Sequence, residues 1–197
     1  MTDTRLPRQL DFIVEVDRLK GVLRQARLVD GSRFENSAEH SWHLALMAIL
    51  LDEYADPGTN VRRTIEMVLV HDIVEIDAGD TFAYDVDGNA DRAEREAAAA
   101  DRLFALLPAD QAGRLRDLWD EFEAGTTAEA RYALALDRLQ PLLQNVFASG
   151  GSWLARRVTR KQVLARMQPI RDLSEPLWTW VVDAIDRTWA GMSRGET

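Results

Sequence analysis

The chain has 197 residues, of which 46% are hydrophobic, and its formal net charge is −9. This length favours one compact domain with a sizeable core, because two independent domains would both be small. The acidic balance argues against a nucleic-acid partner, since contacts to phosphates need a basic surface. The sequence has no cysteine, so disulfides and thiolate sites are excluded and any metal must be held by His, Asp and Glu.

The N-terminal sequence MTDTRLPRQLDF lacks the basic start and apolar core of a signal peptide. No run approaches the roughly 18 apolar residues that a membrane span needs. We therefore expect a cytoplasmic protein with no membrane partner.

Apolar residues recur at helical spacing along nearly the whole chain, and alternating strand patterns are scarce, which predicts an all-α fold. Ser37 precedes a very apolar helix as its expected N-cap, and Pro57-Gly58 ends that helix. Loops are expected at 27–37 and 78–90, and Gly150-Gly151 breaks the chain. The expected helices cover 8–24, 38–55, 61–77, 90–107, 109–123, 128–148, 159–168 and 174–191.

Three groups of polar side chains lie within apolar helical segments. A buried carboxylate is costly unless it is paired, hydrogen-bonded or bound to a metal, and neutral imidazole with ionised carboxylate suits a divalent transition metal. The alternatives are an ion pair of the last aspartate with Arg131 or Arg138, and histidines that are ordinary core residues. The groups are His40 with His43 on one helix, His71 with Asp72 and Glu75 at the end of another, and Asp137 on a third.

Four ordered motifs, EHS at 39–41, HDIVE at 71–75, GD at 79–80 and LALD at 134–137, resemble the HD-domain metal-dependent phosphohydrolases. Within that family the chain is most similar to the 5′-deoxynucleotidase branch, and the similarity runs from about Leu19 to Asp137. The resemblance implies an all-α HD-domain helical bundle. Residues 1–197 would form a single HD domain, with a core at about 19–148 and C-terminal helices at 159–191 packed on it.

The resemblance also implies site residues. One divalent metal ion (Co, Mn, Ni, Fe, Zn or Mg) would lower the pKa of its water and polarise the P–O bond. Glu75 would orient the attacking water, and Asp80 would help in proton transfer or contact the leaving group. His43 would be a supporting or core residue beside the ligands, with a direct contact to the metal or substrate as the alternative. The implied metal ligands are His40, His71, Asp72 and Asp137.

Substrate binding in that branch uses an arginine after a Leu-Lys pair, which corresponds to Arg24 here, and a neighbouring aromatic that selects deoxyribose. Gln25 and Ala26 follow Arg24 instead, so the preference for a 2′-deoxy sugar stays open. Arg33 is a second phosphate candidate, with a solvated loop arginine as the alternative. The basic stretch 156–161 is either a surface helix start or a further phosphate contact.

We therefore expect an enzyme that removes the 5′-phosphate from (deoxy)nucleoside monophosphates. The alternatives are an HD phosphohydrolase for another phosphate ester or anhydride, such as a nucleoside triphosphate or cyclic nucleotide, and a non-catalytic acidic helical interaction module. The family commonly dimerises, which implies a homodimer. Tryptophans 153, 178, 180 and 189 would line its interface or complete the C-terminal core.

Overall fold

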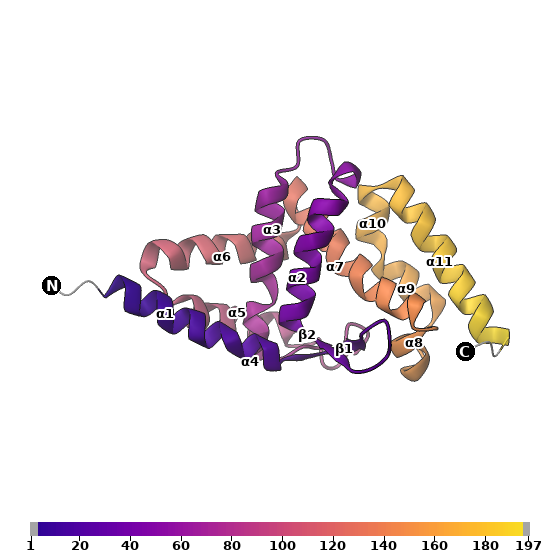
Figure 1. Ribbon diagram of the computed structural model, residues 1–197, viewed down its shortest axis with the longest axis horizontal. Coiled ribbons are helices and arrows are strands. Elements are labelled where there is room, and N and C mark those ends of the chain that lie inside the picture. Colours follow the sequence, from indigo (N-terminus) through magenta and orange to yellow (C-terminus); the bar gives the residue numbers. More distant parts are fainter. Residues whose placement is uncertain (1–3, 195–197) are drawn as a thin grey trace.

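The computed structural model describes residues 4–194, and helices dominate it (Figure 1). The all-α class is confirmed, with one small two-stranded sheet added. Short 3-10 helices carry the label η. In chain order the elements are α1 (Arg5–Val16), η1 (Asp17–Gly21), β1 (Leu23–Arg27), β2 (Phe34–Asn36), α2 (Ser37–Leu50), η2 (Asp52–Tyr54), α3 (Val61–Val70), η3 (His71–Val74), α4 (Glu75–Ala78), α5 (Arg92–Phe104), α6 (Ala109–Ala124), α7 (Ala128–Phe147), α8 (Gly151–Ala155), α9 (Arg160–Arg166), α10 (Gln168–Leu173) and α11 (Glu175–Arg194).

The centre of the molecule is formed by α2, α3 and α7, which all pack on one another. Each contributes large apolar side chains that are almost completely buried, among them Leu44, Met67 and Leu136. Tyr132 on α7 is also fully buried, and its hydroxyl donates a hydrogen bond of 3.0 Å to the carbonyl of Ala48 on α2. This core fixes the three helices from which the candidate site is built.

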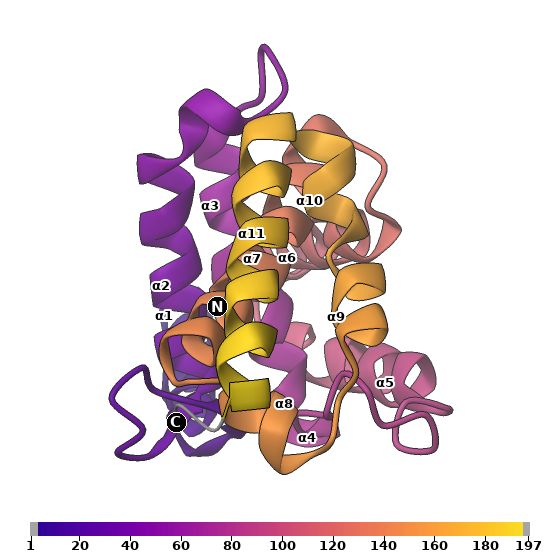
Figure 2. The same cartoon turned by 90° about the vertical axis from the view of Figure 1, so that its right-hand side faces the viewer.

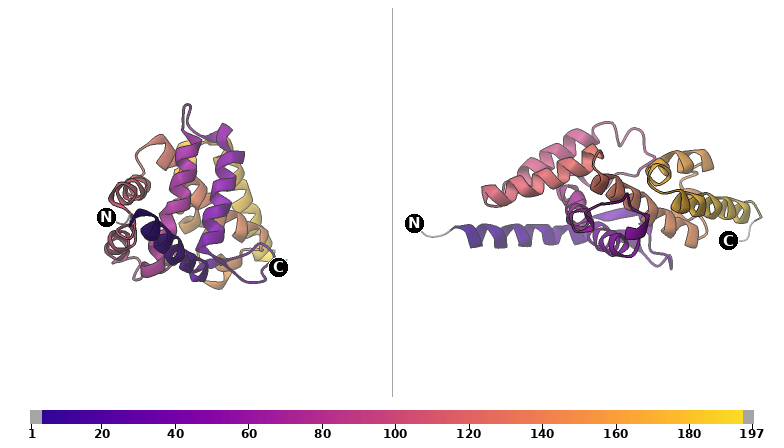
Figure 3. Two further views of the ribbon diagram at one scale, coloured as in Figure 1. Left: turned by 60° about the vertical axis from the view of Figure 1, so that its left-hand side comes forward. Right: turned by 90° about the horizontal axis from the view of Figure 1, so that it is seen from above.

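The remaining helices lie at the two ends of this centre. Helices α1, α5 and α6 form one end. In the view from above, α1 (indigo) runs outward and is drawn below α6 (salmon) on the page (Figure 3, right). Helices α8 to α11 form the other end, where α11 runs along α7 (Figure 2). Trp153 is buried and packs on Trp189 at a centroid distance of 5.3 Å, and Trp178 packs on the core, whereas Trp180 is exposed. Three of these four tryptophans therefore complete the C-terminal core.

The N-terminal region differs from the sequence prediction. The expected helix 8–24 is wrong beyond its first half, because α1 ends at Val16 and η1 leads into a strand. The end of that expected helix and the expected loop 27–37 together form an antiparallel hairpin, in which Leu23 pairs with Asn36 and Arg27 with Phe34. The hairpin satisfies backbone groups locally by cross-strand pairing, which a helical periodicity count does not detect.

The start of α2 also differs from the prediction. Asn36, not Ser37, is the N-cap: its side chain accepts the Glu39 backbone N–H at 2.9 Å, and the Glu39 carboxylate accepts the Asn36 N–H at 3.3 Å. This reciprocal pair is a capping box, in which two otherwise unpaired donors are satisfied. Ser37 is then the first helical residue, and its hydroxyl is free to point into the protein.

The expected helix 61–77 is divided. Helix α3 ends at Val70, the HDIV segment forms the 3-10 turn η3, and α4 adds one more turn. A 3-10 turn is wound more tightly than an α-helix, so it changes the direction in which consecutive side chains point. The other expected helices begin and end within a few residues of the observed bounds. Two short helices were not expected: α8 after Gly150, and α10 between the last two expected helices. None of the helices in residues 4–194 has both the length and the apolar character of a membrane crossing.

Candidate metal centre and substrate pocket

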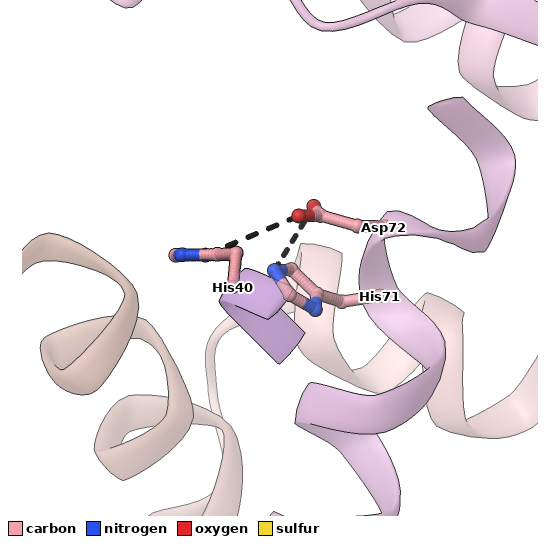
Figure 4. A group of neighbouring side chains, drawn as sticks. All are labelled: His40, His71 and Asp72. Atoms are coloured by element: carbon pink, nitrogen blue, oxygen red, sulfur yellow. Dashed lines mark ion pairs between the residues drawn. The ribbon is translucent and has the colours of Figure 1, made fainter. Parts of the chain in front are cut away.

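Three elements bring two histidines and two aspartates together. Asp137 from α7 has its Oδ1 2.9 Å from His40 Nε2, which comes from α2. Asp72 from η3 has its Oδ1 2.9 Å from Nε2 of its neighbour His71 and its Oδ2 3.9 Å from His40 Nε2. All four residues are at most 8% exposed. His40, His71 and Asp72 offer atoms within 4.8 Å of one another, a spacing compatible with one metal ion (Figure 4).

Each histidine is oriented by its second ring nitrogen. His71 Nδ1 lies 2.9 Å from the carbonyl oxygen of Val68, and His40 Nδ1 lies 3.1 Å from Oε1 of Gln140. Both partners are acceptors, so Nδ1 carries the hydrogen and donates it in each ring. Nε2 is thereby directed at the carboxylates, which is the arrangement that a metal-ligating histidine needs.

The environment of His71 supports a cation at this place. Its Nε2 is buried and has no hydrogen-bond partner, although Asp72 Oδ1 is close, because the contact lacks hydrogen-bond geometry. A buried polar atom without a partner is costly. Two imidazole nitrogens and two carboxylates, with no cysteine present, match the ligand set of a divalent transition metal.

The charges of these groups are strongly coupled. Burial opposes a proton on His71, but the neighbouring Asp72 and Asp137 outweigh it and raise the pKa of His71 to about 10. Burial and the charge of Arg24 oppose a proton on His40, but Asp137, Glu35 and Asp72 together outweigh them and raise the pKa of His40. Burial alone would raise the pKa of Asp72, yet His71 and Arg24 hold it well below its usual range. Without a metal, protons on the histidines thus balance the buried carboxylates.

Arg24 lies beside this cluster because strand β1 carries it there. Its Nη1 donates a hydrogen bond of 2.7 Å to Asp72 Oδ2 and lies 4.0 Å from Glu75 Oε1 and 3.9 Å from Asp80 Oδ1. Its side chain is only 13% exposed. The hairpin that the sequence did not predict is therefore what places this arginine among the carboxylates.

Glu75 and Asp80 lie on the same side as Arg24. Glu75 Oε2 accepts a hydrogen bond of 2.5 Å from the Ser37 hydroxyl, and burial together with the charge of Asp72 raises the pKa of Glu75 to about 8. Asp80 Oδ2 accepts the backbone N–H of Gln25 at 3.1 Å, and burial raises its pKa too. Gly79, with φ of 74°, makes the turn between these two carboxyl groups, a conformation that favours glycine.

Two buried residues of the site were not identified from the sequence. Gln140 Nε2 donates a hydrogen bond of 2.7 Å to Glu35 Oε1, while its Oε1 faces His40. Glu35 is 2% and Gln140 0% exposed. A signal for Gln140 was present, because it follows Asp137 by three positions on one helix and therefore shares its face.

Other residues singled out in the sequence lie elsewhere. Arg33 is exposed and donates to both oxygens of Glu39, at 2.8 and 2.6 Å, outside the pocket that Arg24 lines. His43 Nδ1 lies 3.3 Å from Gln140 Nε2, so His43 contacts the cluster only through Gln140. Of the basic stretch 156–161, Arg156 donates to Gln25 Oε1 at 2.7 Å and stacks over the Phe82 ring.

A pocket of about 360 Å³ opens beside the cluster. His71, Asp72 and Asp137 form part of its wall, together with Glu75 and Asp80. The rest of the lining contains four arginines and several aromatic rings, together with the Glu123 carboxylate and neutral side chains. These residues include Arg24, Phe82, Tyr84, Arg92, Arg138 and Arg166.

The fold and the site together define a class: a helical protein that presents buried histidines and aspartates at the edge of a pocket lined by arginines and carboxylates. The HD domain family matches residues 16–178, and the chain belongs to that family. A crystal structure of a predicted metal-dependent phosphohydrolase from Magnetospirillum magnetotacticum MS-1 is similar, with 50% identity and a TM-score of 0.87, over 95% of this chain and 97% of that one. A conserved hypothetical protein from Pyrococcus furiosus shares the fold, with 18% identity and a TM-score of 0.62, over 90% of this chain and 99% of that one.

Curated relatives are similar as well. The 5′-deoxynucleotidase HDDC2 of Xenopus laevis is 33% identical and that of Homo sapiens 32% identical, each over 136 residues. The aligned part is 68% of this chain and 66% and 65% of those two proteins, so the chain spans just under two thirds of their length.

Proposed function

We propose that this protein is a metal-dependent phosphohydrolase that removes the 5′-phosphate from (deoxy)nucleoside monophosphates. The observation that carries the proposal is the buried Nε2 of His71, which makes no hydrogen bond and faces two aspartates at the wall of an arginine-lined pocket. The similarity to proteins named 5′-deoxynucleotidase supports the substrate class. Residues 1–197 would act as a single HD domain.

The proposed ligands of one divalent metal ion are His40, His71, Asp72 and Asp137. Their support is the short distances between them, their burial, and the orientation of both imidazoles by hydrogen bonds at Nδ1. When bound, such an ion supplies Lewis-acid activation of water and of a phosphoryl oxygen. The donor set is compatible with Co, Mn, Ni, Fe or Zn, and Mg is the remaining candidate.

The proposed acid–base groups are Glu75 and Asp80. Glu75 is held by Ser37 and orients the attacking water, whose oxygen forms the new bond to phosphorus. Asp80 donates its proton to the leaving 5′-oxygen as the P–O bond breaks. The protons of the attacking water stay on the product phosphate, and one of them then returns to Asp80. The raised pKa of Asp80 supports this role, because a carboxyl group must keep its proton to act as an acid.

Arg24 is the proposed contact to the substrate phosphate. It lies among the carboxylates of Asp72, Glu75 and Asp80, where its positive charge offsets theirs and reduces the repulsion of an anionic ligand. Arg33 is left out of the proposal, because it is bound to Glu39 at the surface. The aromatic missing after Arg24 has a counterpart in space, since Phe82 and Tyr84 line the pocket.

The experiment that tests this function is metal removal and substitution. Protein treated with EDTA should release no phosphate from dAMP or dTMP, and Co²⁺ or Mn²⁺ should restore the release. A substrate panel with ribonucleotides, nucleoside triphosphates and cyclic nucleotides then ranks the alternatives. Equal turnover by the chelated wild type and by Asp72→Ala would contradict a metal-dependent reaction at this site.

A homodimer and a cytoplasmic location belong to the same proposal. Four large apolar residues of α1 are 52–72% exposed, and an apolar groove of about 350 Å³ lies between α1 and α6. An apolar surface of this kind is typical of a protein interface, and the proposed occupant is a second copy of the chain. The four residues are Leu6, Leu10, Ile13 and Val14. The absence of cysteine is compatible with a reducing compartment.

A further inference from the structure

Four arginines line the pocket of a chain whose net charge is −9. Three of them are neutralised by carboxylates. Arg24 donates to Asp72 at 2.7 Å, and Arg92 donates to Glu96 at 2.6 Å. Arg138 is paired with its neighbour Asp137.

The fourth arginine, Arg166 at the end of α9, is different. It forms no ion pair with any carboxylate of the described chain, and its guanidinium carbon lies over the Tyr84 ring, 6.0 Å from the ring centroid. Its side chain is half-buried in the pocket wall. A cation withdrawn from water without a counter-charge is costly, so another group must compensate for it.

The surroundings of Arg166 increase that cost. Burial lowers its pKa to about 10, and the nearby positive charge of Arg138 acts in the same direction, whereas Asp137 opposes it. Asp137 is already occupied by Arg138 and by His40. No carboxylate of the described chain therefore pairs directly with the Arg166 guanidinium, which lines the same pocket as Asp137.

We propose that Arg166, with Arg138 beside it, binds a phosphoryl group of the substrate. Guanidinium groups present paired donors that match phosphate oxygens, and two neighbouring arginines together form a site for a doubly charged anion. The bound phosphoryl group is either the 5′-phosphate that is hydrolysed or a second phosphate on the same nucleotide. This inference rests on the proposed function, and it makes α9, near the C-terminal end, part of the substrate site.

The test compares Arg166→Gln with Arg160→Gln, a matched control at the start of the same helix. Arg160 is exposed and paired with Asp186 at 2.6 Å, away from the pocket. We expect KM to rise about 10- to 100-fold in Arg166→Gln, with kcat changed less, because a charge-assisted contact present in both ground and transition states is lost. Arg166→Lys should restore part of the affinity, and Arg160→Gln should match the wild type.

Two substrates distinguish the two sources of phosphate. Equal losses with dAMP and with 2′-deoxyadenosine 3′,5′-bisphosphate identify the 5′-phosphate as the ligand. A loss confined to the bisphosphate identifies the second phosphate. Unchanged KM for both, in a chain whose wild type is active, would overturn the inference.

A structural role of Arg166 makes a different prediction. If the arginine only supported the fold, Arg166→Gln would lower Tm, whereas the loss of an uncompensated cation should leave Tm unchanged or raise it. If the wild type hydrolyses neither nucleotide, the proposed function fails, and calorimetric titration with inorganic phosphate decides the inference separately. At least tenfold weaker phosphate binding by Arg166→Gln supports it, and equal binding rejects it.

Discussion

The Ser37 hydroxyl lies 2.5 Å from Oε2 of Glu75, and both side chains are buried. This contact joins the first residue of α2 to the first residue of α4, and it fixes the carboxyl group proposed to orient water. Ser37→Ala leaves that carboxyl group without its donor, and loss of one buried hydrogen bond costs about 1–3 kcal/mol. We expect kcat for nucleoside monophosphates to fall about tenfold in steady-state assays, with KM nearly unchanged.

Ser41→Ala is the matched control for this substitution. Ser41 is also buried on α2, but its hydroxyl has no hydrogen-bond partner in the described structure. Its kcat should stay within about twofold of the wild type, since no buried hydrogen bond is lost. Similar losses in both variants would mean that α2 is generally sensitive and that the Ser37 contact is not specific.

Metal content should depend on Asp72 and not on Asp77, which lies five positions later in the sequence. Asp72→Asn removes a buried carboxylate that is proposed to bind the metal, whereas Asp77 is exposed and paired with Arg102. We expect metal analysis of purified Asp72→Asn to find below about a tenth of the wild-type metal, because ligand loss weakens binding by an order of magnitude or more. Asp77→Asn should retain the wild-type content, and equal depletion of the two variants would argue against the assignment.

The stability of the metal-free protein should fall as the pH rises. The pKa of His71 is raised to about 10 from its ordinary value of 6.5. The contribution of protonated His71 to the free energy of unfolding is therefore fully present below pH 6.5, and it is lost progressively as the pH approaches 10. Within this window each pH unit removes about 1.4 kcal/mol of stability at most, or roughly 3–6 °C in Tm. Thermal unfolding of EDTA-treated protein between pH 6.5 and 9 measures this loss.

Bound metal should offset part of the loss of stability at high pH. A bound divalent ion replaces the protons on both histidines, so metal affinity should rise with pH and metal binding should release protons. Calorimetric titration in two buffers with different ionisation enthalpies counts the protons released at pH 7. A count near zero would show that the histidines are already neutral without metal.

Arg24 and Arg33 should respond differently to substitution. Arg24 is buried among carboxylates at the pocket, whereas Arg33 is exposed and bound to Glu39. Arg24→Gln should raise KM for dAMP about 10- to 100-fold, because a charged contact to phosphate is lost. Arg33→Gln should leave KM within about twofold, since an exposed ion pair contributes little. A larger rise in KM for Arg33→Gln than for Arg24→Gln in initial-rate measurements would indicate that Arg33 binds the substrate.

The apolar face of α1 should govern self-association. If a second copy covers it, the wild type should have a mass of twice 22.3 kDa in light scattering after size exclusion. The double variant Leu10→Glu and Ile13→Glu places charges on this face and should be monomeric, because desolvating a carboxylate is costly. Leu154→Glu, at an equally exposed apolar position on α8, should stay dimeric. A wild type that is already monomeric would refute the dimer.

The sequence was informative where chemistry leaves a local signature. The helices around Met67 and Leu136 follow from apolar periodicity, and the HD motif singles out His71 and Asp72 before any geometry is known. Their convergence with Asp137 is a long-range packing result that no local pattern contains. The hairpin at Arg24 was missed because its strands are short and pair with each other, and Arg166 was missed because an arginine on a helix is ordinarily a solvated side chain.

The pairing of Leu23 with Asn36 has a consequence for how this region tolerates change. Arg24 follows the first of these residues, and the second caps the helix that carries His40. Arg24 and His40 are thus both fixed at the base of the β1–β2 hairpin, while residues 28–33 form its tip. Insertions at the tip should leave the spacing at the base intact. One residue inserted between Asn36 and His40 would rotate the imidazole by about 100° around the helix axis and turn it away from its partners.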